Sequence, residues 1–226
     1  MKRKISLLLA ILACAAGASG VYGQFGFTGI KRPNIANIFR PVPGAGAAYE
    51  TTDKDGSKSI MEMSIVDSEM VGTQQGYWME IGHSSRESDG IRYGKVLVTP
   101  ADFAFHKIIF VMPGSTQPME MDMDATKSRR ETMDKNLEKW HSVGTESITV
   151  PAGTFSCEHW TKDDGKGDVW VSSKVSPMGM VKSVDNGETM VLTKVITSAK
   201  SHITGTPVKF DPQMMRQQMQ MNKPKP

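Results

Sequence analysis

Apolar and polar side chains alternate along two segments in the middle of the chain. In residues 119–124 methionines alternate with acidic residues, and residues 61–66 repeat the pattern with Met, Met and Ile on one set of positions. A period of two places the two sets on opposite faces of a β-strand, so both segments are predicted to be half-buried strands. Further runs rich in β-formers are residues 77–81, 107–112, 168–172 and 190–196.

Turn sequences separate these runs. Tight turns are predicted at residues 53–56, 163–165 and 185–187. Each of these segments ends in a glycine that directly follows Asp or Asn. Residues 150–153 read Val-Pro-Ala-Gly and suit a type I turn, with proline second and glycine fourth. This turn is predicted to join residues 147–150 to residues 154–157 as a hairpin.

Helical patterns occur in only two places. Over Lys127 to Trp140, Met133, Leu137 and Trp140 fall on one face of a charged segment. Asp211-Pro212 supplies a cap and first turn for a short helix from Gln213 to Met221. The predicted fold is therefore mainly β, with antiparallel strands forming the sheet and one or two helical segments beside it.

The first 23 residues have the layout of a secretory signal. A basic start at residues 1–4 precedes an apolar run from Ile5 to Ala13 and a stretch of small residues. The apolar run is shorter than the roughly 20 residues that span a bilayer, so a retained membrane helix is not expected. Residues 11–14, Ile-Leu-Ala-Cys, offer an alternative in which Cys14 is acylated; only then would the protein be tethered to a membrane. Plain secretion is favoured because Leu12 is unusual at its place in such a motif.

The remaining chain divides into three parts. Residues 24–46 are rich in Gly, Pro and Ala and are predicted to be a linker, with Phe25, Phe27 and Phe39 able to dock it locally. Residues 47–204 carry the strands and form the antiparallel β domain. Residues 205–226 are a Met/Gln-rich tail that contains the short second helix.

Charge and cysteine content narrow the function. Loss of Lys2, Arg3 and Lys4 with the signal leaves 24 of the 27 basic residues against 24 acidic ones, so the exported chain is formally neutral. Without a basic stripe, nucleic acid is not an expected partner. Once Cys14 is removed or acylated, Cys157 has no partner for an intrachain disulfide and is expected to be a buried, inert thiol.

Three sequence features, in this order, carry a resemblance to known proteins: residues 150–155 (Val-Pro-Ala-Gly-Thr-Phe), residues 168–171 (Asp-Val-Trp-Val) and residues 177–182 (Pro-Met-Gly-Met-Val-Lys). Over residues 47–204 the chain resembles a group of uncharacterised exported bacterial domains, distantly similar to the lipoprotein-sorting carriers of the bacterial envelope. The resemblance implies a strongly curved antiparallel sheet, or half-barrel, closed by helical segments over an apolar cavity. It supplies no catalytic residues.

Seventeen methionines make metal binding the first chemistry to consider. Thioethers select Cu(I), but residues i and i+4 of one strand lie roughly 13 Å apart, so a site would need neighbouring strands. Methionine also lines deformable apolar interiors, and that interpretation is favoured. The tail methionines 214, 215, 219 and 221 are expected to belong to a mobile segment.

Enzyme chemistry has little support in the sequence. Cys157 and His159 share a strand face and could form a thiolate–imidazole site with a third group such as His141, but the pair alone is a weak signal. No nucleophile elbow, zinc-protease helix or phosphate-binding glycine loop is present in the sequence. Most acidic residues are expected to be solvated, and no cofactor is predicted.

The favoured function is therefore a non-enzymatic exported protein that binds or carries an apolar ligand, such as a lipid, in its curved sheet. The predicted apolar lining, chosen for size and strand placement, is Trp78, Phe110, Met121, Trp170, Met180 and Leu192. The first alternative is a periplasmic copper-binding protein that uses Met61, Met63, Met119, Met121 and Met123. The second is an interaction module whose terminal arms recruit an envelope protein.

Overall fold

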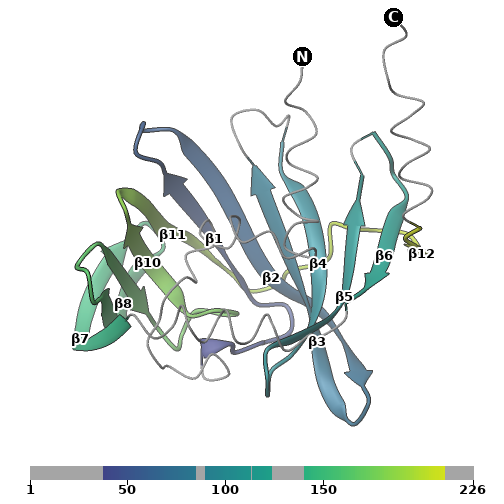
Figure 1. The fold of residues 1–226 in the computed structure, drawn as a ribbon, viewed down its shortest axis with the longest axis horizontal. Coiled ribbons are helices and arrows are strands. Elements are labelled where there is room, and N and C mark those ends of the chain that lie inside the picture. Colours follow the sequence, from purple (N-terminus) through teal and green to yellow (C-terminus); the bar gives the residue numbers. More distant parts are fainter. Residues whose placement is uncertain (1–37, 85–89, 113, 124–139, 212–226) are drawn as a thin grey trace, which may run out of the picture.

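The computed structural model describes residues 38–84, 90–112, 114–123 and 140–211, which form one open sheet of twelve strands (Figure 1). The order across the sheet is β12-β6-β5-β4-β3-β2-β1-β11-β10-β9-β8-β7. The strands are β1 (Gly46–Thr52), β2 (Lys58–Val71), β3 (Gln74–Ser84), β4 (Arg92–Thr99), β5 (Ala104–Val111), β6 (Pro118–Asp122), β7 (Trp140–Val150), β8 (Gly153–Lys162), β9 (Gly167–Val171), β10 (Met180–Asp185), β11 (Glu188–Ile196) and β12 (Val208–Lys209).

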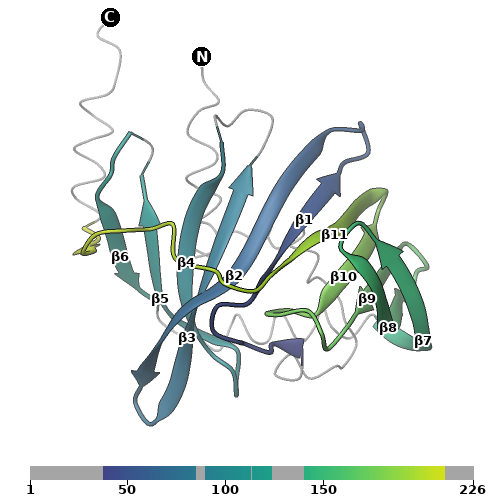
Figure 2. The same ribbon diagram turned by 180° about the vertical axis from the view of Figure 1, so that it is seen from behind.

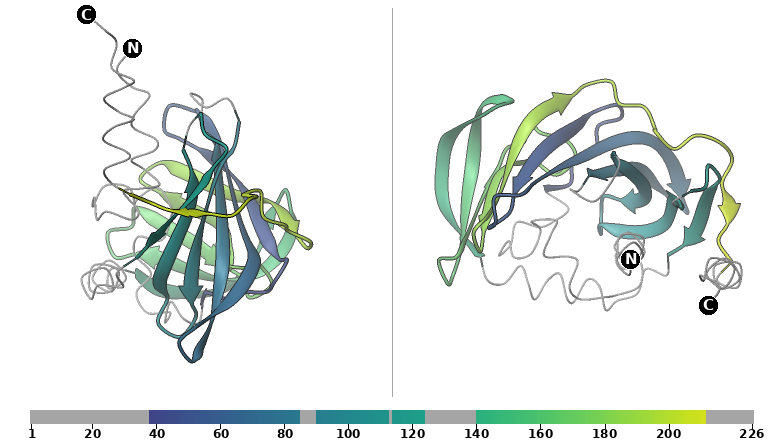
Figure 3. Two further views of the ribbon diagram at one scale, coloured as in Figure 1. Left: turned by 90° about the vertical axis from the view of Figure 1, so that its right-hand side faces the viewer. Right: turned by 90° about the horizontal axis from the view of Figure 1, so that it is seen from above.

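The sheet is strongly curved, and seen from above it forms an arch (Figure 3). Every pairing is antiparallel except that of β12 with β6. The predicted mainly β fold with a curved, half-barrel-like antiparallel sheet is therefore confirmed. The inner face of the arch is defined here by Tyr49, Met61 and Met79, and the outer face by Trp78 and Leu97.

The strands and turns follow the sequence pattern closely. The predicted β-runs lie within strands, with three differences at their ends. Residues 107–112 and 168–172 each extend one residue past the strand, and of residues 119–124 the strand β6 contains only 119–122. The turn between β10 and β11 has positive φ angles at Asn186 (50°) and Gly187 (86°), the mirror-image turn that suits the twist of a hairpin. Val150 pairs with Gly153, so Pro151 and Ala152 form the two-residue connection of the β7–β8 hairpin.

Both predicted helices fall outside the described residues, apart from Trp140, which is the first residue of β7. The last part of the predicted linker is described, and it packs on the sheet. Phe39 is buried, its ring centroid lies 5.2 Å from that of Phe103, and Gly44 donates its N–H to the Ile65 carbonyl at 2.8 Å. Ordered backbone hydrogen bonds therefore reach upstream of β1.

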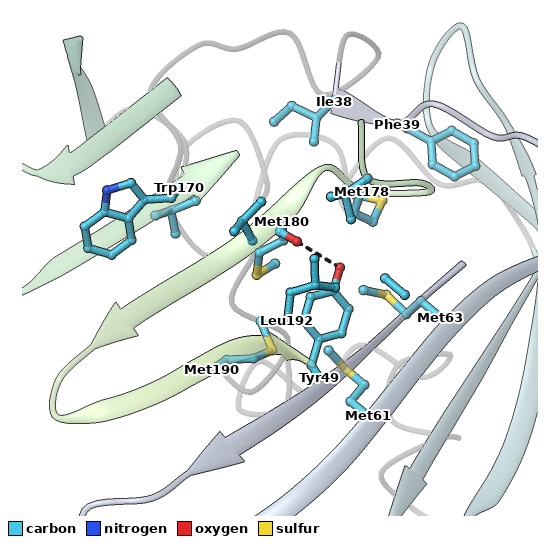
Figure 4. Packing of buried hydrophobic residues seen from close by; sticks show 14 of the residues in the cluster. Ile38, Phe39, Tyr49, Met61, Met63, Trp170, Met178, Met180, Met190 and Leu192 are labelled. Carbon is cyan, nitrogen blue, oxygen red and sulfur yellow. Dashed lines mark hydrogen bonds between the residues drawn. The ribbon is translucent and has the colours of Figure 1, made fainter. Parts of the chain in front are cut away.

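The main core lies on the inner side of β1, β2, β10 and β11 and is rich in methionine (Figure 4). Tyr49 stands at its centre, is fully buried, and donates its hydroxyl to the Met180 carbonyl at 3.1 Å. Burial raises the pKa of Tyr49 far above its usual range, so this hydroxyl stays protonated and remains a donor. Six methionines, all at most 4 % exposed, belong to the same cluster: Met61, Met63, Met79, Met178, Met180 and Met190.

A second, smaller core lies on the outer face, where the chain after β11 crosses the sheet toward β6 (Figure 2). We call residues 199–207 the strap. Its Ile203 packs with Trp78, Leu97 and Ile109. Beneath it, the Glu80 carboxylate accepts hydrogen bonds from the Ser201 hydroxyl (2.7 Å) and the His202 main-chain N–H (2.9 Å). The strap therefore covers apolar residues on the outer face of the sheet, not on the inner face.

Candidate functional site: the inner face of β3–β6

Residues that pair directly across adjacent strands point to the same side of a sheet, so the strand register assigns side chains to the inner face. Three parallel rows result. The first row runs Tyr49, Met61, His83, Arg92; the second runs Ala47, Met63, Ile81, Gly94, Phe110, Met119; and the third runs Ile65, Met79, Val96, Ile108, Met121. The second and third rows carry no polar side chain from β1 or β2 to β6.

Exposure changes along these rows. In β2 the inner-face residues are closed into the main core, with Met63 only 1 % exposed. Toward β6 several members are half-buried, including Ile81, Val96 and Met121. Ile81 and Val96 pack against the main core, so the apolar surface is continuous with it. The β5 members Ile108 and Phe110 are themselves only 3 % and 2 % exposed. The inner face of β3–β6 is thus an extension of the core that solvent reaches at Ile81 and Val96 and at the β6 methionines.

The first row forms a polar end of this surface on β3 and β4. His83 and Arg92 pair across β3 and β4 and are both half-buried. Burial lowers the pKa of His83, which favours the neutral imidazole at neutral pH. Among the described residues, no carboxylate forms an ion pair with Arg92, and none accepts a hydrogen bond from it.

The structure divides the six residues predicted as apolar lining into three groups. Met180 and Leu192 lie in the closed main core beside Tyr49 (Figure 4). Phe110 and Met121 lie in the inner-face rows of β5 and β6, and the Phe110 ring is 5.7 Å from that of Phe210. The two tryptophans differ: Trp78 packs under the strap on the outer face, whereas Trp170 belongs to the main core cluster and pairs with His159 and Lys182.

The methionines considered for copper fall into two separate places. Met61 and Met63 are buried in β2, whereas Met119 and Met121 belong to β6 and Met123 follows it. Strands β3, β4 and β5 lie between β2 and β6 in the sheet. The structure therefore does not pair these methionines on neighbouring strands, as a shared site would need. Over the described ranges, no three His, Cys, Asp or Glu side chains are grouped to hold a metal ion either.

Cys157 and His159 do share a face of β8, as their spacing predicts, but their surroundings are those of a closed network. His159 lies between two carboxylates, with Nδ1 2.8 Å from Glu146 and Nε2 2.9 Å from Asp168. Its ring stacks on Trp170, whose indole N–H also donates to Glu146 at 2.6 Å. Cys157 is fully buried, and burial together with the Glu146 charge raises its pKa to about 11.

This network therefore satisfies its own polar groups and keeps the thiol protonated. His141, considered as a third member, instead contacts Asp163 at 3.0 Å.

The inner-face residues that sequence reasoning missed are His83, Ile81, Val96 and Arg92. The alternation Met79, Ile81, His83 is visible in the sequence and would have placed His83 on the same face as Met79. Arg92 had no such signal, because its face depends on how β4 pairs with β3.

Comparisons with known proteins add little to this description. No protein-family model and no curated protein matches the chain. Two solved structures are similar to it, both at a TM-score of 0.38. One is a candidate lipoprotein from Parabacteroides distasonis, with 16% identity over 70% of this chain and 97% of that one. The other is a candidate exported protein with a YmcC-like fold from Bacteroides fragilis, with 11% identity over 70% and 98%. Likeness at this level does not define the function of this chain.

Within the described residues, no helix is long and apolar enough to cross a membrane.

Proposed function

We propose that this protein is exported to the cell envelope and acts without catalysis, binding an apolar ligand such as a lipid on the inner face of β3–β6. The observation that carries the proposal is the row structure of that face. Val96, Phe110, Met119 and Met121 continue the core across three strands, β4 to β6, and three of these four side chains stay partly open to solvent. Binding of an acyl chain would remove this apolar surface from water.

Methionine suits such a role. Its unbranched, polarisable side chain adapts to irregular apolar partners, and Met119 and Met121 supply it at the β6 end of the rows. The export step rests on the signal-like residues 1–23. The non-catalytic assignment is supported by the Glu146, His159 and Asp168 network, in which each polar partner is already engaged.

The copper alternative has weaker support. Met61 and Met63 are at most 4 % exposed and contribute to the packed core around Tyr49. An ion there would have to displace that packing, and three strands separate these residues from the β6 methionines. The geometry favours the apolar-ligand proposal.

A neutral fluorescent probe tests the proposal directly. N-phenyl-1-naphthylamine brightens in apolar surroundings, and saturable binding to the purified protein is expected. Val96→Lys places a charge in the middle of the third row and should weaken binding of the probe at least tenfold. The matched control is Val143→Lys, because Val143 is 57% exposed on β7, far along the sheet.

If Val96→Lys fails to fold by circular dichroism, Met121→Lys repeats the test at the half-buried β6 end of the row. Absence of saturable binding to the wild-type protein, or equal binding by the inner-face and control variants, would overturn the proposal.

A further inference from the structure

We propose that Met119 and Met121 form an oxidation site on β6, where a two-electron oxygen donor such as hydrogen peroxide converts their thioethers to sulfoxides and thereby weakens binding of the apolar ligand. This inference rests on the proposed function, because it concerns regulation of the same surface. Its structural basis is that solvent reaches two methionines at the β6 end of the inner-face rows.

The first step concerns access to sulfur. The six methionines of the main core are at most 4 % exposed, so the folded protein shields them from an oxidant in solution. Met119 and Met121 are half-buried instead. Strand β12 pairs with Met119 and Glu120 and ends there, so within the described residues Met121 has no strand partner on the open side of β6. The Cys157 thiol is fully buried and burial raises its pKa to about 11, so it does not compete for peroxide.

The second step concerns position. Met119 pairs with Phe110 in the second row and Met121 lies in the third row, so both side chains point to the proposed ligand surface. Met70 is more exposed, at 59 %, but it lies near the end of β2 and outside the three rows. Oxidation of Met70 is therefore expected to leave the ligand surface unchanged. Exposure and row position together single out the two β6 methionines.

The third step concerns the chemistry. The O–O bond of the peroxide breaks, one oxygen atom bonds to the sulfur, and water leaves; the thioether is oxidised by two electrons and the peroxide is reduced by two. The sulfoxide is polar and a hydrogen-bond acceptor, whereas the thioether is apolar. Covering the sulfoxide with an apolar ligand that has no donor costs free energy. The unoxidised surface therefore binds such a ligand more tightly than the oxidised one.

Limited oxidation followed by probe titration tests the proposal. The purified protein is treated with hydrogen peroxide, catalase removes the excess, and peptide mass spectrometry with fragment ions locates each added oxygen atom. Met119 and Met121 should be oxidised while the core methionines are not, and circular dichroism should show an unchanged fold. The oxidised protein should bind N-phenyl-1-naphthylamine more weakly by roughly tenfold or more.

Variants assign the effect to the two residues. Each variant is compared with its own unoxidised form, so a change in its basal affinity does not enter the result. Met119→Leu/Met121→Leu keeps both side chains apolar without sulfur and should lose most of the sensitivity to peroxide. If this double variant fails to fold, Met121→Leu alone should lose part of it. The matched control Met70→Leu should stay as sensitive as the wild-type protein.

Oxidation elsewhere in the chain persists in the double variant, including at Met112 and Met123, which are half-buried just past the ends of β5 and β6. Equal sensitivity of the double variant and the wild-type protein would therefore overturn the proposal. So would oxidation of the core methionines before Met119 and Met121, or probe binding that oxidation leaves unchanged. Absence of probe binding by the unoxidised protein would instead refute the proposed function, so the two failures are distinguishable.

Discussion

The attachment of the strap to the outer face makes a quantitative prediction for Glu80→Gln. The Glu80 carboxylate is 2% exposed and accepts hydrogen bonds through both oxygens. Oε1 accepts from the His202 main-chain N–H at 2.9 Å and lies 2.8 Å from His202 Nδ1, while Oε2 accepts from the Ser201 hydroxyl at 2.7 Å. Glutamine keeps the shape but replaces one acceptor oxygen with an NH2 donor and removes the charge.

Two charge-assisted hydrogen bonds would be lost or reversed, at about 1.5–3 kcal/mol each. Because the His202 side chain is 53% exposed, water would replace part of the loss. We expect the strap to be destabilised by about 2–4 kcal/mol, which corresponds to a roughly 30- to 700-fold larger population of the locally open state.

Hydrogen exchange at the His202 and Ile203 amides measures that opening, and urea unfolding measures the effect on the whole domain. The matched control is Glu62→Gln, because Glu62 has one long contact, 3.3 Å from the Tyr93 hydroxyl, and should change stability by less than about 1 kcal/mol. Unchanged exchange in the strap of Glu80→Gln would refute the argument that this carboxylate holds it in place.

Three further predictions concern buried or half-buried polar groups. Tyr49→Phe should cost about 1–2 kcal/mol of unfolding free energy in urea, because the Met180 carbonyl loses its buried donor; no loss would show that the bond contributes nothing. The pKa of His83 is lowered in the folded protein, so just below pH 6.5 the unfolded chain binds more protons at this residue than the folded chain does. The free energy of unfolding should therefore rise with pH through that range. His83→Gln should flatten that part of the stability–pH curve, and an equally steep curve would contradict it. Cys157, with no exposed surface and a pKa of about 11, should react with Ellman's reagent only after unfolding in urea; rapid reaction of the native protein would refute its burial.

The strands were predictable because their signals are local. Alternation in β2 and the Asn186-Gly187 turn depend only on neighbouring residues, and both are present in the structure. Which face of a strand a residue occupies was less predictable. Bulges shift the register between Met180 and Lys182 and between Ser142 and Gly144, and each added residue changes the alternation.

Long-range contacts explain the other differences. The prediction that acidic residues are mostly solvated does not extend to Glu80, whose buried carboxylate binds a segment more than a hundred residues later in the chain. The candidate site shows the same limit. Met121 could be chosen from its pattern, whereas the pairing of Arg92 with His83 required the β3–β4 register.

The central claim, that an apolar ligand occupies the inner face of β3–β6, is tested most directly by photocrosslinking. A fatty acid with a diazirine near its methyl end would be irradiated with the protein and the adducts located by peptide mass spectrometry. The account predicts saturable labelling at inner-face residues such as Val96 and Met121, competed by unlabelled myristate. Labelling confined to the strap and its outer-face neighbours, or no saturable labelling, would contradict it.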